Sequence, residues 1–160
     1  MTYRIAGLNP HDFASLAGLD EAALALRGAC RVIADADRGF PCRITLEDAR
    51  KCEALILLHH VSHDVAMPYR SAYAIYVREG AEAAAEYIDE PPPVFAGRPL
   101  ALRGFGPDGM LRAATLAMPG AADEQVRAML ADAGIAYIDA HNAAHGCFAA
   151  RIERFEGSAG

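Results

Sequence analysis

The sequence predicts an α+β fold in which a mostly antiparallel or mixed sheet, built from hairpins, carries helices packed mainly on one face. Three observations favour this class. Short apolar runs alternate with the period of half-buried strands. Glycine and proline between the later runs indicate tight turns. Helical patterns are inserted among the strands without strict alternation. The chain has 160 residues, the size of one ordinary domain, so residues 1–160 are expected to form a single domain.

The first part of the chain predicts two strands and a short helix. Residues 3–8 read as a strand, and a helix follows with Asp20 as its N-cap and Gly28 just beyond its end. Residues 30–35 alternate and indicate a second strand. Thr45 begins a cap-like pattern that favours one helical turn or a tight turn.

The middle of the chain predicts the centre of the sheet. Residues 53–61 form a continuous apolar run of strand length, which is typical of a central strand. Residues 71–78 alternate and predict another strand. The alanine-rich segment 80–88 predicts a short helix that ends before the prolines at 91–93.

A hairpin and a helix are expected next. Residues 100–105 and 110–116 flank a Gly-Pro-Asp-Gly turn at 106–109. A helix is predicted to begin near Asp123, because the first turn of a helix favours acidic side chains. Apolar residues follow at helical spacing until Gly134 ends the helix.

The last segment predicts a second hairpin, with strands at 135–142 and 147–155. In a short-turn register Asp139 lies close to Arg151, so an ion pair is expected across the two strands. Arg154 is expected on the opposite and wetter face.

The charge and composition exclude several classes of partner. The net charge of −6 disfavours nucleic acid and anionic membranes, whose nonspecific binding depends on clustered basic residues. No apolar run approaches the roughly 20 residues of a membrane span, and no secretory signal is evident, so we expect a cytoplasmic protein. The four cysteines are then expected as reduced thiols. Nearly all basic residues are arginines, which suit an anionic small molecule.

The first candidate site follows the apolar strand, where His59, His60 and His63 precede the loop containing Tyr69 and Arg70. Strand ends and loops of this kind often hold catalytic side chains. His59 and His60 point to opposite faces of a strand and cannot both bind one metal unless the chain bends. The alternative is one histidine in the core with solvated neighbours.

The second candidate site lies at the tip of the last hairpin, which contains His141, Asn142, His145 and Cys147. Histidine and cysteine are zinc-ligand types, but their spacing here matches no known finger. Turn geometry alone also explains the asparagine and the neighbouring glycine.

The third candidate site is the loop with Cys42 and Arg43. A thiol beside guanidinium groups is a candidate nucleophile, provided that a histidine lies within hydrogen-bond reach as a base. The alternative is a buried, inert cysteine. Nucleotide-loop, dinucleotide, zinc-protease, hydrolase and EF-hand motifs are missing from the sequence, and we expect neither a cofactor nor a structural metal.

The sequence resembles a bacterial family known only as domain of unknown function 1203. The resemblance covers nearly the whole chain and implies a small stand-alone bacterial protein, without implying any activity. It rests on the segments Gly39-Phe40-Pro41-Cys42-Arg43, Leu46-Glu47-Asp48-Ala49, Pro68-Tyr69-Arg70, Ile75-Tyr76-Val77-Arg78-Glu79-Gly80-Ala81, Ala140-His141-Asn142-Ala143 and Gly146-Cys147-Phe148-Ala149-Ala150-Arg151-Ile152.

These motifs coincide with the three candidate sites, so we expect the sites to converge on one pocket for an anionic small molecule. Cys42, His59 and His141 are the candidates for thiol or acid-base chemistry. The candidate ligand-binding residues are Arg43, Tyr69, Arg70, Asn142 and Cys147. Two alternatives stay open: a metal-binding protein, and a noncatalytic interaction module or homodimer. Whether the protein is an enzyme is not decided by the sequence.

Overall fold

A computed structural model describes residues 1–157, so the last residues of the predicted domain, 158–160, lie outside the described residues. Its regular elements are β1 (Tyr3–Ala6), η1 (Pro10–Asp12), η2 (Ala14–Leu16), α1 (Glu21–Leu26), β2 (Cys30–Ile33), β3 (Ala54–His63), β4 (Ser71–Arg78), β5 (Glu86–Ile88), η3 (Pro93–Phe95), β6 (Leu100–Phe105), β7 (Leu111–Ala117), α2 (Ala122–Leu130), β8 (Tyr137–Asn142) and β9 (Phe148–Arg154).

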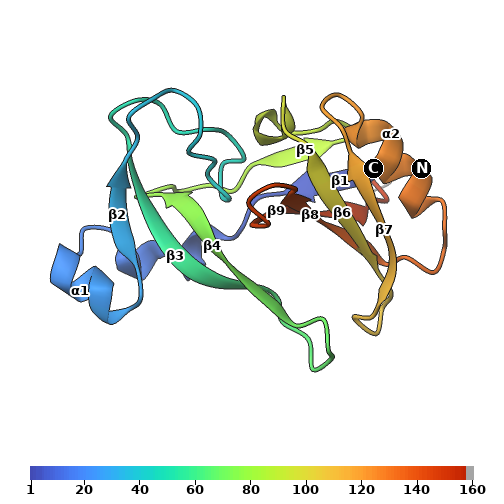
Figure 1. Cartoon of the computed structure of the whole chain (residues 1–160), viewed down its shortest axis with the longest axis horizontal. Helices are drawn as coiled ribbons and strands as arrows, with labels where there is room; N and C mark the ends of the chain where they lie inside the picture. The colour runs from blue at the N-terminus through green and yellow to red at the C-terminus, as the bar shows by residue number, and fades with distance from the viewer. Residues whose placement is uncertain (158–160) are drawn as a thin grey trace.

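The strands form two antiparallel sheets instead of one (Figure 1). Sheet A has the order β5-β1-β9-β8-β6-β7, and sheet B has the order β2-β3-β4. The predicted α+β class with antiparallel sheets is therefore confirmed. The two helices lie against different sheets, since α1 contacts β2 whereas α2 contacts β6 and β7. The expected packing of helices mainly on one face is not observed.

Local sequence signals account for most of the elements. The Asp20 side chain accepts a hydrogen bond from the Ala23 N–H at 2.8 Å and begins α1, as its N-cap pattern predicts. Gly28, just beyond that helix, has a φ of +66°. The run predicted as central is β3, which lies between β2 and β4 in sheet B. Both predicted hairpins are present, as β6–β7 and β8–β9.

The predicted helix at 80–88 is wrong. The segment leaves β4 as a turn at Gly80, crosses as a loop and ends in β5, which pairs with β1. Its backbone groups are bonded to distant chain segments: the Ala85 N–H donates to the Ile44 carbonyl at 2.9 Å, and the Ala85 carbonyl accepts from the Gly7 N–H. These long-range bonds take the place of the helical bonds that the alanines favour.

Close backbone contact joins β1 to the loop that follows β2. The Leu8 N–H donates to the Arg43 carbonyl at 2.8 Å. A side chain at Gly7 would place its Cβ 1.9 Å from the Ile44 oxygen, so only glycine fits there. The position of Arg43 is therefore fixed by backbone contacts with a distant strand.

Two main apolar clusters form the core. One lies between sheet A and α2, and it includes Leu102, Val126 and Ile138. The other gathers residues of α1, β3 and β4, and Phe148 of β9 joins it. Sheet A thus contacts the core of sheet B through β9.

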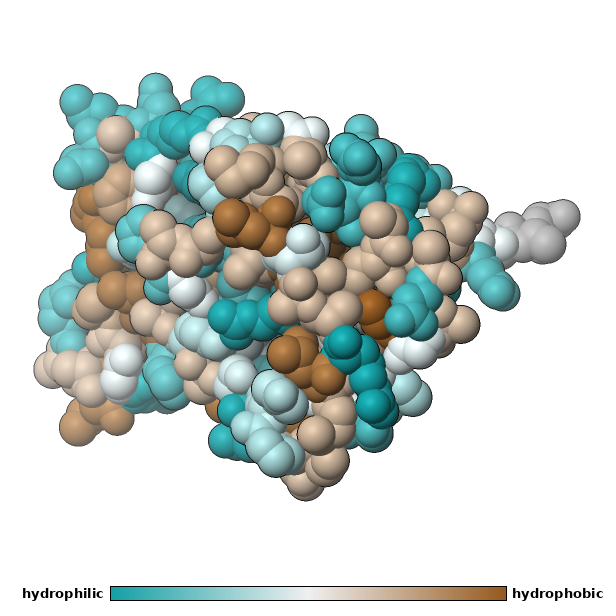
Figure 2. Space-filling model, turned by 45° about the vertical axis from the view of Figure 1, so that its right-hand side comes forward, coloured by the Kyte–Doolittle hydropathy of each residue, from teal (hydrophilic) through white to brown (hydrophobic). Residues whose placement is uncertain are grey.

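On the face shown in Figure 2, hydrophobic residues lie in small groups among hydrophilic ones. Within residues 1–157, the helices are too short or too polar to cross a membrane.

Candidate functional site

A cavity of about 330 Å³ lies where the two sheets approach each other. It is lined from four segments, 39–43, 74–76, 97–99 and 142–147. The second belongs to β4 of sheet B, and the last is the β8–β9 turn of sheet A. Of the residues predicted to bind a ligand, Arg43, Asn142 and Cys147 meet here.

Arg43 is the buried charge of this cavity, with 1% of its surface exposed. Its backbone N–H donates to the Tyr76 carbonyl at 2.9 Å. Its Nη2 approaches the Cys147 sulfur at 3.5 Å. Nε and Nη1 are buried and have no hydrogen-bond partner in residues 1–157, and no carboxylate in that range pairs with the guanidinium. Burial lowers the pKa of Arg43, but arginine starts from so high a value that the group stays a cation at neutral pH.

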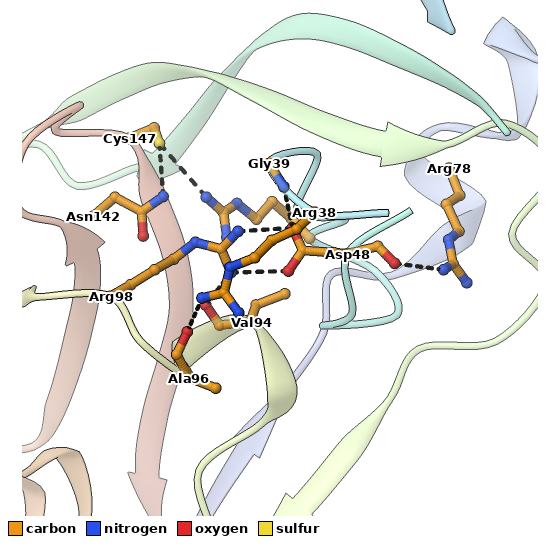
Figure 3. Close-up of polar contacts among 10 residues, drawn as sticks. Arg38, Gly39, Asp48, Arg78, Val94, Ala96, Arg98, Asn142 and Cys147 are labelled. Atoms are coloured by element: carbon orange, nitrogen blue, oxygen red, sulfur yellow. Dashed lines mark hydrogen bonds and ion pairs between the residues drawn. The ribbon is translucent and has the colours of Figure 1, made fainter. Parts of the chain in front are cut away.

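Asn142 ends β8 at the same cavity and is 8% exposed. Its Nδ2 donates to the Cys147 sulfur at 3.5 Å, as the dashed line in Figure 3 marks. Its Oδ1 is buried without a partner among the described residues. The turn is closed by the Gly146 N–H, which donates to the Asn142 carbonyl at 2.7 Å, and Gly146 has a φ of +78°. The hairpin therefore fixes the amide and the sulfur together.

Arg98 also lines the cavity, but its charge is compensated. It donates to both oxygens of Asp48 at 2.7 and 2.9 Å (Figure 3). Burial alone would raise the pKa of Asp48, yet the bonds from Arg98 bring it below its usual value. Arg43 therefore supplies the uncompensated positive charge of a lining that contains no Asp or Glu among the described residues.

Cys42 lies outside this lining, although it neighbours Arg43 in sequence. It is fully buried, and its sulfur accepts backbone N–H groups of Ile44 and Thr45 at 3.4 Å and of Arg78 at 3.2 Å. The side chain thus organises the loop backbone.

His141 and His59 also lie away from the cavity lining. His141 is buried, its Nδ1 bonds to the Gly146 carbonyl at 3.0 Å, and its ring packs edge-on against Tyr73 and Phe148. Burial lowers its pKa to about 4, so the ring is neutral at pH 7 and Nδ1 is the donor. His59 is exposed on β3, opposite Ala74.

Tyr69 and Arg70 lie near a different end of the sheets. The Tyr69 ring packs edge-on against Phe105, and the exposed Arg70 pairs with Asp64. Cys42, Tyr69, Arg70 and His141 therefore do not share this cavity, contrary to the expectation that the sites converge. The physical reason is that their strands belong to two sheets, so the strand ends do not meet along one edge.

Sequence reasoning did not identify Arg98 and Tyr76 as lining residues. Arg98 lies in a glycine-proline loop with no recognisable pattern, and Tyr76 reads as an ordinary strand residue. Across residues 1–157, no three His, Cys, Asp or Glu side chains come together in a way that could hold a metal ion.

The model of a family described as proteins of unknown function (DUF1203) matches residues 39–154. That range includes each of the four segments that line the cavity. A search of curated proteins and a search of solved structures found no match.

Proposed function

Because the chain belongs to the DUF1203 family of proteins of unknown function, we propose a function from the cavity itself: it binds a small anionic molecule through Arg43. The proposal rests on the Arg43 guanidinium, which is buried and has no carboxylate partner within residues 1–157. Removing a charge from water costs several kcal/mol even after the protein relaxes. An anion in the cavity would offset that cost by pairing with the Arg43 guanidinium, because Arg43 belongs to the lining.

The size and lining of the cavity limit what it can hold. Pockets for drug-sized ligands occupy about 300–1,000 Å³, so this one suits a small metabolite. Alanine, proline and isoleucine side chains cover much of its wall, including Ala74, Ile75 and Ala143. A carboxylate with a short apolar body fits this combination better than a highly charged polyphosphate does.

Thiol chemistry at Cys147 is a second candidate function, favoured by one observation. Cys147 is the cysteine that lines the cavity, and His145, a candidate base, lines it too. The Cys147 sulfur receives N–H groups from Arg43 and Asn142, which orient it in the cavity. We place anion binding ahead of thiol chemistry because binding requires only the buried charge of Arg43.

Calorimetric titration of the purified protein with 3-methylbutanoate and with inorganic phosphate tests the binding proposal. Arg43→Met keeps the length of the side chain and removes the charge. Arg112→Met is the matched control, since Arg112 is half exposed on the β6–β7 hairpin and pairs with Asp108. We expect the carboxylate to bind wild type and the control equally, and Arg43→Met at least tenfold more weakly. No binding to wild type, or equal binding to all three proteins, would overturn the proposal.

A further inference from the structure

We propose that the natural ligand is a 2-hydroxy carboxylate, a small acid that carries a hydroxyl on the carbon next to its carboxylate. The inference rests on the proposed function and adds a second recognition element to it. Arg43 supplies only donors, and Asn142 supplies an acceptor that has no donor within residues 1–157. A ligand that complements both must accept hydrogen bonds at one point and donate one at another.

The Asn142 amide is oriented so that its oxygen is the unsatisfied group. Its Nδ2 donates to the Cys147 sulfur, whereas its Oδ1 has no donor within residues 1–157, and the residue as a whole is 92% buried. The neighbouring Arg98 does not serve it, because Nη1 and Nη2 of Arg98 donate to Asp48 and to the Val94 carbonyl. A buried acceptor without a donor is costly, so a hydroxyl at this point gains a full hydrogen bond.

The two recognition side chains are held close together by a shared contact. Arg43 Nη2 and Asn142 Nδ2 each lie 3.5 Å from the Cys147 sulfur, so these two nitrogens are at most 7.0 Å apart, twice that distance. One small molecule can therefore contact both side chains, and a hydroxyl on the carbon next to the carboxylate is the most compact way for it to carry both groups.

Charge decides which donor the ligand carries. An ammonium group is also a donor, but the lining has the Arg43 guanidinium and, within residues 1–157, no acidic side chain to receive it. A neutral hydroxyl avoids that repulsion. The small apolar residues of the wall, Ala74 and Ala143 among them, accommodate a short aliphatic body.

The test compares three probe acids by calorimetry on the wild-type protein. These are 2-hydroxy-3-methylbutanoate, 3-methylbutanoate, which lacks the hydroxyl, and 2-methoxy-3-methylbutanoate, which keeps the oxygen but cannot donate. We expect the hydroxy acid to bind about tenfold or more tightly than the other two. This ligand series requires no mutation, so misfolding cannot obscure it.

Asn142→Leu then assigns the preference to the amide oxygen. In this variant the hydroxy acid should lose its advantage, while 3-methylbutanoate binds within about threefold of its wild-type affinity. Equal binding of the three acids to wild type, or an unchanged preference in Asn142→Leu, would overturn the inference and leave anion binding at Arg43 intact. Failure of all three acids to bind would instead overturn both proposals.

Discussion

Two arginines contact the β8–β9 hairpin, one within its strands and one at its turn, and only the first is paired with a carboxylate among the described residues. Arg151, within β9, pairs with Asp139 of β8 through Nε–Oδ1 and Nη2–Oδ2 contacts of 2.7 and 3.0 Å, as the sequence predicted. Its guanidinium also lies over the Tyr137 ring, 4.3 Å from the ring centre. The guanidinium of Arg43, at the turn end of the hairpin, has a sulfur as its only hydrogen-bond partner among the described residues.

The difference distinguishes Arg151, whose charge is neutralised within the fold, from Arg43, whose charge is left for a ligand to neutralise. Asp139 and Arg151 satisfy each other, so their positions are explained by the fold alone. Nothing in residues 1–157 compensates Arg43, although it is the more deeply buried of the two. A folded chain tolerates such a group where function requires it.

Arg151→Ala gives the largest expected effect on stability. The substitution leaves the Asp139 carboxylate, 1% exposed, without its partner and should lower the free energy of unfolding by about 3–5 kcal/mol. Urea denaturation at pH 7.5 measures the change. A loss below about 1 kcal/mol would mean that the pair contributes no more than a surface ion pair.

His141 lies on β8 between the two arginine sites, and its pKa predicts an acid-sensitive step. The pKa is depressed to about 4 in the folded protein, against 6.5 for the free side chain. Below pH 6.5 the unfolded chain therefore takes up a proton that the folded chain does not, and stability falls as the pH falls. Between pH 7.5 and pH 5 we expect this residue to cost about 2 kcal/mol.

The measurement compares the free energies of unfolding of wild type and His141→Phe at those two pH values. The variant should lose about 2 kcal/mol less on acidification than wild type does. Identical pH dependence in both proteins would show that the ring is solvated.

Arg154→Ala should have a smaller effect than Arg151→Ala. Arg154 is on the exposed side, where it donates to the carbonyls of Leu130, Asp132 and Ile135 at 2.6, 2.8 and 2.5 Å, at and just after the end of α2. Water can replace these bonds, so we expect a loss of about 1 kcal/mol in thermal or urea melts. A loss equal to that of Arg151→Ala would remove the distinction between a buried pair and an exposed cap.

Arg43→Met is the substitution for which we expect no loss of stability. Without ligand, the substitution removes an uncompensated buried charge, so the free energy of unfolding should stay unchanged or rise by up to about 2 kcal/mol. The same urea series measures it. A loss of several kcal/mol would show that Arg43 supports the fold, and the contrast with Arg151 would disappear.

Elements set by neighbouring residues could be predicted from the sequence. Asp20 and Gly28 bound a short helix, and the turn at 106–109 joins β6 and β7. The Asp139–Arg151 pair also follows from a short hairpin register. In each case the partners lie close along the chain, so composition and spacing suffice.

The rest depends on contacts between distant segments. The alanines at 80–88 favour a helix, but β1 supplies the partner that draws the end of this segment into a sheet. The cavity joins Arg43 to Cys147, which are 104 positions apart, and no local pattern encodes their approach. The residue types at the site could be recognised in the sequence. The fold alone determines which of them share one cavity, and it places Tyr69 and Arg70 outside that cavity.

The strand order of sheet A has a consequence for how the chain folds. β1 lies between β5 and β9, and the contact of Arg4 with Glu153 spans 149 positions, whereas β3 and β4 are joined by a short loop. Long-range pairing closes slowly because the entropy of a large loop is lost before the contacts form. During synthesis sheet B can therefore form early, whereas β1 can pair with β9 only after β9 has left the ribosome.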